Sequence, residues 1–181
     1  MLAHEEGRFV LTTTPKSAGF TLIELMITIV IFSITLTFGV SSYRAWVKSS
    51  QIRNAAESIV NGIQRARAEA VKRNTSIVFD LSADSSWQIS VAGSGVIETR
   101  SSSEGSKNVT VQATPLGATT ITLNSLGMIV PNSPVSSQPT QFDITSTPAA
   151  GSRALRVNIG LGGTVRMCDP NLPTGSSPRA C

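Results

Sequence analysis

Residues 20–40 read FTLIELMITIVIFSITLTFGV, the longest apolar stretch in a chain of 181 residues. At a rise of about 1.5 Å per residue, a helix of this length spans roughly 31 Å, close to the thickness of a bilayer's hydrocarbon core. The stretch is therefore predicted to cross a membrane. Its single ionisable residue is Glu24, and a carboxylate inside a membrane costs about 2.5 kcal/mol or more unless it has a partner.

The residues before the stretch are polar and basic, and they read Pro15-Lys16-Ser17-Ala18-Gly19. A secretory signal peptide is cut behind its apolar region, whereas these small residues lie ahead of it. A cut at Gly19 would leave the apolar helix on the mature chain. The run KSAGFTLIELM, residues 16–26, resembles the prepilin motif of type IV pilins and type II secretion pseudopilins.

This resemblance implies specific roles for three residues. A prepilin peptidase would cut after Gly19 and methylate the new amino group of Phe20, and Glu24 would set the axial register of the subunit in a fibre. Residues four apart share a helix face, so that the Glu24 carboxylate can approach the amine of Phe20 on its own or a neighbouring chain. In low dielectric this pairing offsets part of the desolvation cost.

Two other interpretations of the amino-terminal segment remain open. The segment is also compatible with a plain membrane anchor in which Glu24 is tolerated, and with a conventional signal peptide cut near Ser42. The mature amino terminus distinguishes the three, because only the pilin interpretation predicts a chain that starts at a methylated Phe20.

A helical pattern continues beyond the apolar stretch. No proline occurs between Pro15 and Pro115, and apolar residues recur at steps of three and four, as on the buried face of a helix. These residues are Ile52, Ala56, Ile59, Ile63, Ala66 and Ala70. We predict one helix over residues 20–73, with the membrane-spanning part at 20–40 and an extramembrane amphipathic part at 41–73.

From residue 75 the apolar period changes to two, which is typical of β-strands. Residues 77–81 and 87–91 are predicted to form a hairpin. The other predicted strands are 108–113, 118–123, 128–130, 141–145, 155–159 and 164–168, with a turn at Gly160 to Gly163. Residues 93–105 and 131–139 are predicted loops. The fold class is therefore α+β: a long amino-terminal helix packed on an antiparallel sheet.

A helix followed by such a sheet is similar to the pilin architecture. Within it, several segments resemble the GspH/FimT type of minor pilin or pseudopilin, namely 66–74, 78–80, 122–127 and the closing hairpin before Cys168. The resemblance implies four parts. They are a removed leader at 1–19, a transmembrane half-helix at 20–40, an extramembrane half-helix at 41–73 and a β-rich GspH/FimT-like domain at 74–181.

The two cysteines, Cys168 and Cys181, lie close in sequence among prolines and a glycine. We predict that they form a disulfide in an oxidising compartment. A metal site is less favoured because it would lack other soft ligands, and two free thiols are the remaining alternative. The one histidine, His4, falls in the predicted leader. Histidine-based nucleophilic or zinc chemistry is thus not expected in the mature chain. We predict no enzyme activity, no metal site and no cofactor.

Charge is distributed unevenly along the exported part. Residues 44–73 carry seven basic and two acidic side chains, and residues 144–181 carry four basic and one acidic. In some FimT-type minor pilins a basic carboxy-terminal segment binds DNA, and the corresponding candidates are Arg153, Arg156, Arg166 and Arg179. Such residues would contact phosphates without reading sequence. Trp46 is assigned to the membrane interface and Trp87 to the core.

The resemblance therefore implies a minor pilin, a structural or priming subunit of a type IV pilus that inserts through its amino-terminal helix. The alternatives are a type II secretion pseudopilin and a DNA-binding minor pilin for DNA uptake. Expected partners are other pilins or pseudopilins, the prepilin peptidase, an inner-membrane assembly platform and, for the third function, DNA. The expected location is the bacterial inner membrane, crossed once, with the globular domain in the periplasm and later in the fibre.

Overall fold

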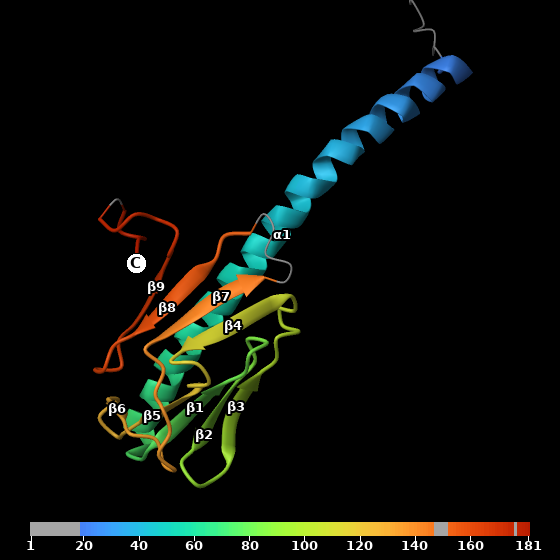
Figure 1. Ribbon diagram of the computed structural model, residues 1–181. Helices are drawn as coiled ribbons and strands as arrows, with labels where there is room; N and C mark the ends of the chain where they lie inside the picture. The colour runs from blue at the N-terminus through green and yellow to red at the C-terminus, as the bar shows by residue number, and fades with distance from the viewer. Residues whose placement is uncertain (1–18, 147–151, 176) are drawn as a thin grey trace, which may run out of the picture. The chain divides into compact units, whose positions relative to one another are not determined.

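The computed structural model describes residues 19–146, 152–175 and 177–181, apart from the side chains of residues 37–39 and 41. The predicted leader lies outside the described residues except for Gly19. The chain forms two compact units, Met1–Val40 and Ser41–Cys181. The β-rich domain lies in the second unit (Figure 1).

The helix α1 (Leu22–Arg73) is 52 residues long and confirms the predicted helix to within two residues. It begins at Leu22 because the Oγ1 of Thr21 accepts a hydrogen bond of 3.3 Å from the backbone N–H of Glu24, which caps an otherwise unpaired donor. It ends where Asn74 adopts a left-handed conformation with φ 50°. Lys72 and Arg73 occupy the last turn, where positive charge is favoured by the helix dipole.

Over the part of the chain that the structure describes, no helix combines the length and the apolarity needed to cross a membrane. The transmembrane role of residues 20–40 stays a prediction.

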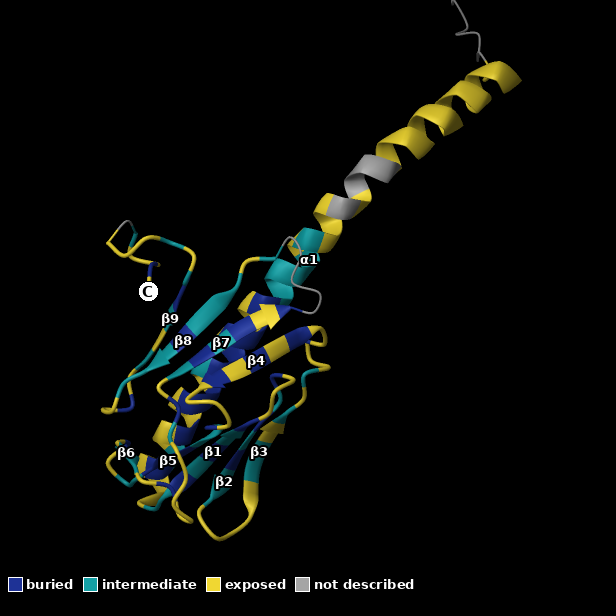
Figure 2. Cartoon of the chain, viewed as in Figure 1, coloured by how far each residue is buried: buried dark blue, intermediate teal, exposed yellow. Residues whose placement is uncertain are grey.

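Within the second unit, α1 buries one face. The buried residues follow the predicted spacing and are completely inaccessible to solvent: Ile52, Ala55, Ala56, Ile59, Ile63, Ala66 and Ala70. The opposite face carries charged and amide side chains, so that dark and light stripes alternate along this part of the helix in Figure 2. The predicted amphipathic pattern is confirmed.

Nine strands follow the helix. Their bounds are β1 (Ile77–Leu81), β2 (Trp87–Val91), β3 (Val96–Arg100), β4 (Val109–Thr114), β5 (Thr120–Leu123), β6 (Ile129–Val130), β7 (Gln141–Ser146), β8 (Leu155–Ile159) and β9 (Val165–Cys168) within the described residues. They form two antiparallel sheets with the orders β3-β2-β1-β5-β6 and β4-β7-β8-β9. The predicted hairpin is β1–β2, in which Phe79 lies opposite Ile89.

Two expectations about the strands were wrong. The predicted loop over 93–105 contains the edge strand β3, whose accessible residues do not alternate as a half-buried strand would. The predicted single sheet is divided in two. Nine twisted strands in one sheet would splay away from a single helix, whereas two sheets both reach the apolar face of α1.

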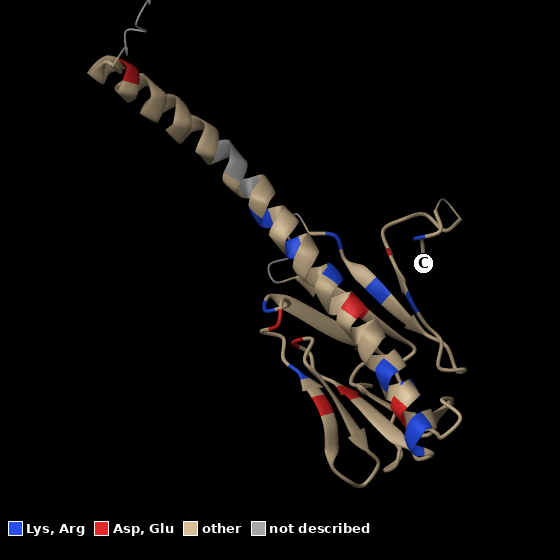
Figure 3. Cartoon of the chain, turned by 180° about the vertical axis from the view of Figure 1, so that it is seen from behind, with Lys and Arg blue, Asp and Glu red and all other residues tan. Residues whose placement is uncertain are grey.

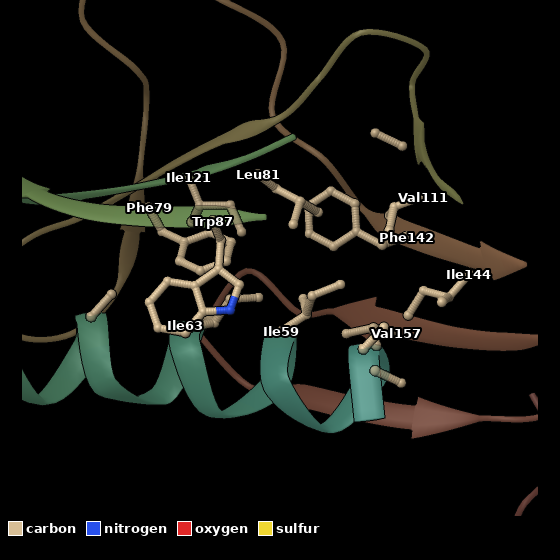
Figure 4. Close-up of a cluster of buried hydrophobic side chains, with 14 of the residues drawn as sticks. Ile59, Ile63, Phe79, Leu81, Trp87, Val111, Ile121, Phe142, Ile144 and Val157 are labelled. Atoms are coloured by element: carbon tan, nitrogen blue, oxygen red, sulfur yellow. The ribbon is translucent and has the colours of Figure 1, made fainter. Parts of the chain in front are cut away.

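The core lies between α1 and the two sheets (Figure 4). Phe79 and Ile121 come from the first sheet, Phe142 and Val157 from the second, and all four are fully buried. Trp87 is 6% exposed, which confirms its assignment to the core. The core thus joins the part of α1 in the second unit and both sheets into one packed unit.

The closing hairpin β8–β9 forms one edge of the second sheet. Its turn at Gly160 to Gly163 is confirmed: the Gly160 N–H donates a hydrogen bond of 2.8 Å to the Thr164 carbonyl. Gly163 has φ +74°, and a Cβ there would lie 2.5 Å from the carbonyl oxygen of Gly127. A side chain at this position would therefore push the turn away from the first sheet.

Candidate functional site

The predicted processing site lies in a short non-helical stretch just before α1. Gly19, Phe20 and Thr21 precede the first helical residue, and the Phe20 side chain is 82% exposed. Exposed backbone outside regular structure is where proteases cut most readily. The Gly19–Phe20 bond is thus accessible, and cleavage at this bond stays a prediction.

Glu24 lies in the first turn of α1, three residues after the capping residue Thr21. This Thr-x-x-Glu spacing is that of a capping box, in which an acidic side chain near the helix start also interacts favourably with the dipole. In the uncut chain Phe20 carries an amide rather than an amine. The predicted pairing of Phe20 with Glu24 belongs to the cut chain and stays a prediction.

Between residues 22 and 36, α1 exposes large apolar side chains around its circumference. The run Ile29-Val30-Ile31-Phe32 covers a full turn, and each of its side chains is at least 57% exposed. A helix that stands in water normally has a polar face. Large apolar side chains that are exposed on every side of a helix pack favourably against lipid or against other helices.

The carboxy-terminal loop is closed by the disulfide between Cys168 and Cys181, which confirms the predicted pairing. Two backbone contacts add to it. The Asp169 N–H donates a hydrogen bond of 2.7 Å to the Arg179 carbonyl, and the Arg166 guanidinium donates one of 2.6 Å to the Pro178 carbonyl. The loop is thus attached to the end of β9 at several points.

The four arginines predicted to bind DNA have different environments. Arg156 is held by the Asp143 carboxylate at 2.6 Å, and Arg166 is engaged with the loop backbone. Arg153 is 3.6 Å from Asp169. Among the described residues, no carboxylate is paired with Arg179. Most of the basic residues lie along α1 and near the carboxy terminus (Figure 3). Because Arg153 and Arg156 are paired with carboxylates, the four arginines do not form one continuous row of unpaired cations.

A cavity of about 350 Å³ brings two of these arginines together with a third from the helix. Its basic lining is Arg53, Arg153 and Arg179, and its apolar lining is Trp46, Leu155 and Met167. Sequence reasoning missed Arg53 and Trp46 as members of this site. The sequence did hold one indication that Trp46 and Arg53 lie together, because they are seven residues apart and such residues share a helix face.

The carboxylates in the β-rich unit have structural partners. Asp80 accepts a hydrogen bond of 2.7 Å from the Thr120 hydroxyl, and Glu98 pairs with Arg65 at 2.7 Å. Asp84 accepts hydrogen bonds from the N–H and hydroxyl of Ser86 and from the Ser102 hydroxyl. The Ser86 N–H is the main cause that lowers the pKa of Asp84 below its ordinary value.

Near the end of α1, the pKa of Glu69 is lowered mainly by its hydrogen bond with Arg73, with Lys72 adding to the effect. In the described ranges, no three His, Cys, Asp or Glu side chains gather as metal ligands would. Asp84 thus holds the turn between β1 and β2, and Glu69 is paired at the end of α1.

The family model for type II transport protein GspH matches residues 55–175, which is more than half of the chain. The chain belongs to the GspH family. A second model, for the prokaryotic N-terminal methylation motif, matches residues 14–40 of this GspH-family protein. The two matches confirm the resemblance to GspH-type minor pilins and pseudopilins, which are membrane-anchored subunits that assemble with other pilins in a fibre.

Solved structures similar to this GspH-family protein include the type IV minor pilin FimU of Pseudomonas aeruginosa in two crystal forms. The first form has 19% identity, covers 72% of this chain and 94% of its own, and gives a TM-score of 0.48. The second form has 18% identity, covers 71% of this chain and 98% of its own, and gives a TM-score of 0.47. The minor pseudopilin EpsH from the type 2 secretion system of Vibrio cholerae has 15% identity. It covers 67% of this chain and 99% of its own, with a TM-score of 0.48. No curated protein matches the chain.

Proposed function

We propose that this GspH-family protein is a non-enzymatic minor pilin, a structural or priming subunit of a type IV pilus. The observation that carries the proposal is the series of large exposed apolar side chains on α1 between residues 22 and 36, next to an accessible Gly19–Phe20 bond. Such a helix is stable in lipid before assembly and among like helices afterwards. The match to the N-terminal methylation motif over residues 14–40 supports the same role.

The proposed mechanism follows from the chemistry of the cut. Removal of residues 1–19 converts the amide nitrogen of Phe20 into an amine. Because the charged amine and the Glu24 carboxylate are then both in an apolar environment, their pairing relieves the cost of burying each one. In a stack of helices this pairing selects one axial register. Residues 20–40 move from the inner membrane into the fibre core, while the sheet domain, residues 74–181, stays on the outside of the fibre.

Substitution of the glutamate tests this mechanism. Glu24→Ala should leave the protein in the membrane fraction but remove it from sheared fibres, because the apolar surface remains while the register is lost. Glu57→Ala is the matched control, since Glu57 is an exposed acid on the same helix, 3.8 Å from Arg53. The control should enter fibres normally. Recovery of Glu24→Ala in fibres at the wild-type level would contradict the assigned role.

The second candidate function is that of a type II secretion pseudopilin. The description of the matching family, type II transport protein GspH, favours it. Deletion of each assembly platform in the native host distinguishes the two functions. For a pilus subunit, loss of the pilus platform abolishes recovery in sheared fibres and loss of the secretion platform has no effect. The reverse pattern identifies a pseudopilin.

A further inference from the structure

The cavity between α1 and the carboxy-terminal loop, called here the arginine cavity, combines cations with an apolar floor. Its basic lining is Arg53, Arg153 and Arg179, and Asp169 is its one acidic residue. The Trp46 side chain is 66% exposed beside them. Because the cavity has an excess of positive charge next to apolar side chains, it is suited to an anionic group that has an apolar neighbour.

Two of the three guanidinium groups are only loosely engaged. Arg53 is 3.8 Å from Glu57, in a pair with both side chains more than half exposed, and among the described residues no carboxylate is paired with Arg179. Exposed pairs of this length contribute little to stability. Arg53 and Arg179 can therefore turn toward a ligand at little cost, whereas Arg153 lies 3.6 Å from the buried Asp169 carboxylate and stays with it.

The wall that carries Arg179 is fixed in place. The disulfide joins Cys168 to Cys181, and the backbone N–H of Asp169 binds the Arg179 carbonyl at 2.7 Å. A preorganised wall lowers the ordering cost of binding. Ser49 and Ser50 on α1 also line the cavity. The Ser49 hydroxyl donates its hydrogen bond to the Ala45 carbonyl at 3.0 Å, which leaves the Ser50 hydroxyl as a donor for an oxygen ligand.

We propose that the arginine cavity binds a polypeptide partner through an Asp or Glu side chain that is adjacent to an apolar residue. Arginine recognises a carboxylate through two parallel hydrogen bonds. Leu155, Met167 and Trp46 would cover the apolar neighbour. The site lies within residues 41–181 and does not depend on the helix segment proposed to enter the fibre core.

The same observations argue against a nucleic acid as the occupant. A volume of about 350 Å³ fits one or two side chains. A duplex needs a row of accessible cations along its backbone, whereas Arg156 and Arg166 are already engaged. Asp169 in the lining can remain paired with Arg153, which leaves Arg53 and Arg179 to bind a single carboxylate.

An unbiased peptide selection tests the proposal on the full-length protein in detergent. A random peptide library is selected against the wild type and against the Arg53→Gln, Arg179→Gln double variant. We expect enrichment of Asp or Glu next to an apolar residue with the wild type only. The enriched peptide should bind the double variant at least about tenfold more weakly than it binds the wild type. A version of the peptide with Asp→Asn or Glu→Gln should bind the wild type more weakly than the enriched peptide does, by at least about the same factor.

Arg44→Gln is the matched control, because Arg44 is exposed on the same helix but does not line the cavity. This variant should bind the peptide as the wild type does, and circular dichroism should show that all variants are folded. Three outcomes overturn the proposal: no acidic motif is enriched, the motif is enriched equally by the double variant, or a mixed-sequence oligonucleotide displaces the peptide and loses affinity in the double variant.

Discussion

The indole Nε1 of Trp87 in β2 donates a hydrogen bond of 2.8 Å to the Ser58 hydroxyl of α1, and both groups are buried. This bond connects the first sheet to the helix at the level where the Trp87 and Phe79 rings are 5.8 Å apart. It satisfies a donor that would otherwise be buried without a partner. The packing of sheet on helix is thus fixed by a polar contact as well as by the apolar core.

Ser58→Ala should lower the free energy of unfolding by about 1–2 kcal/mol, because it leaves the indole N–H buried and unpaired. Urea denaturation measures the change. A double-mutant cycle with Trp87→Phe supplies the control, since Phe has no N–H to satisfy. Once Trp87 is replaced, the cost of Ser58→Ala should largely disappear. Additive effects of the two substitutions would show that the bond contributes nothing.

Gly62→Ala should destabilise the protein, although alanine is the better helix former by about 1 kcal/mol. A Cβ at this position would lie 2.8 Å from the Phe79 ring and 3.0 Å from the Trp87 ring. Such overpacking typically costs about 1–3 kcal/mol. Gln64→Ala, on the exposed face of the same helix turn, should be neutral or slightly stabilising. A stabilised Gly62→Ala variant would mean that helix and sheet are not in this close contact.

Replacing both cysteines with serine should cost about 3 kcal/mol, the loop-entropy estimate for a ring of this size. The chain separation of the bridge is 13 residues. Thermal melts of the variant and of the wild type with and without reductant measure the cost. The variant should melt like the reduced wild type. An unchanged melting temperature in both would indicate that the bridge does not stabilise the domain.

Asp84 should make stability depend on pH in the acid range. Its pKa is lowered in the folded state, mainly by the Ser86 N–H. The folded state therefore holds the charged form more strongly than the unfolded state does. This contribution is complete above the ordinary aspartate pKa of 3.8 and is lost as the pH falls through the lowered folded value.

The Asp84→Asn variant should therefore lose stability relative to the wild type near pH 6, and the difference should shrink as the pH is lowered below 4. Denaturation midpoints measured across this range test the prediction. Asp80→Asn is not a suitable control, because the Asp80 carboxylate accepts a hydrogen bond from Thr120. An Asp84→Asn effect that is constant with pH would exclude titration of Asp84 as its cause.

Much of the architecture was predictable because it depends on local periodicity. The steps of three and four from Ile52 to Ala70 and the alternation around Phe79 each describe a face buried on one side. The helix over residues 20–73 was predicted to within two residues, whereas the cap at Thr21 was not predicted. The edge strand β3 was not predicted, because only Val96 and Ile97 in it are apolar and they are adjacent rather than alternating.

The division into two sheets and the arginine cavity depend on contacts between residues distant in sequence. Periodicity marks β4 as a strand but does not say that it pairs with β7 rather than with β1. In the same way, Arg53 and Arg179 lie on opposite ends of the second unit's sequence, and the disulfide loop brings them to one cavity. The carboxy-terminal arginines form a group in the sequence, but this group did not indicate that Arg53 of α1 lies in the same cavity.

The most direct test of the central claim is the mass of the amino-terminal peptide of the protein isolated from its native membrane. Cleavage after Gly19 and modification of the new terminus predict a peptide that begins at Phe20 and carries one methyl group on its amino nitrogen. A chain that begins near Tyr43 or retains residues 1–19 would contradict the account.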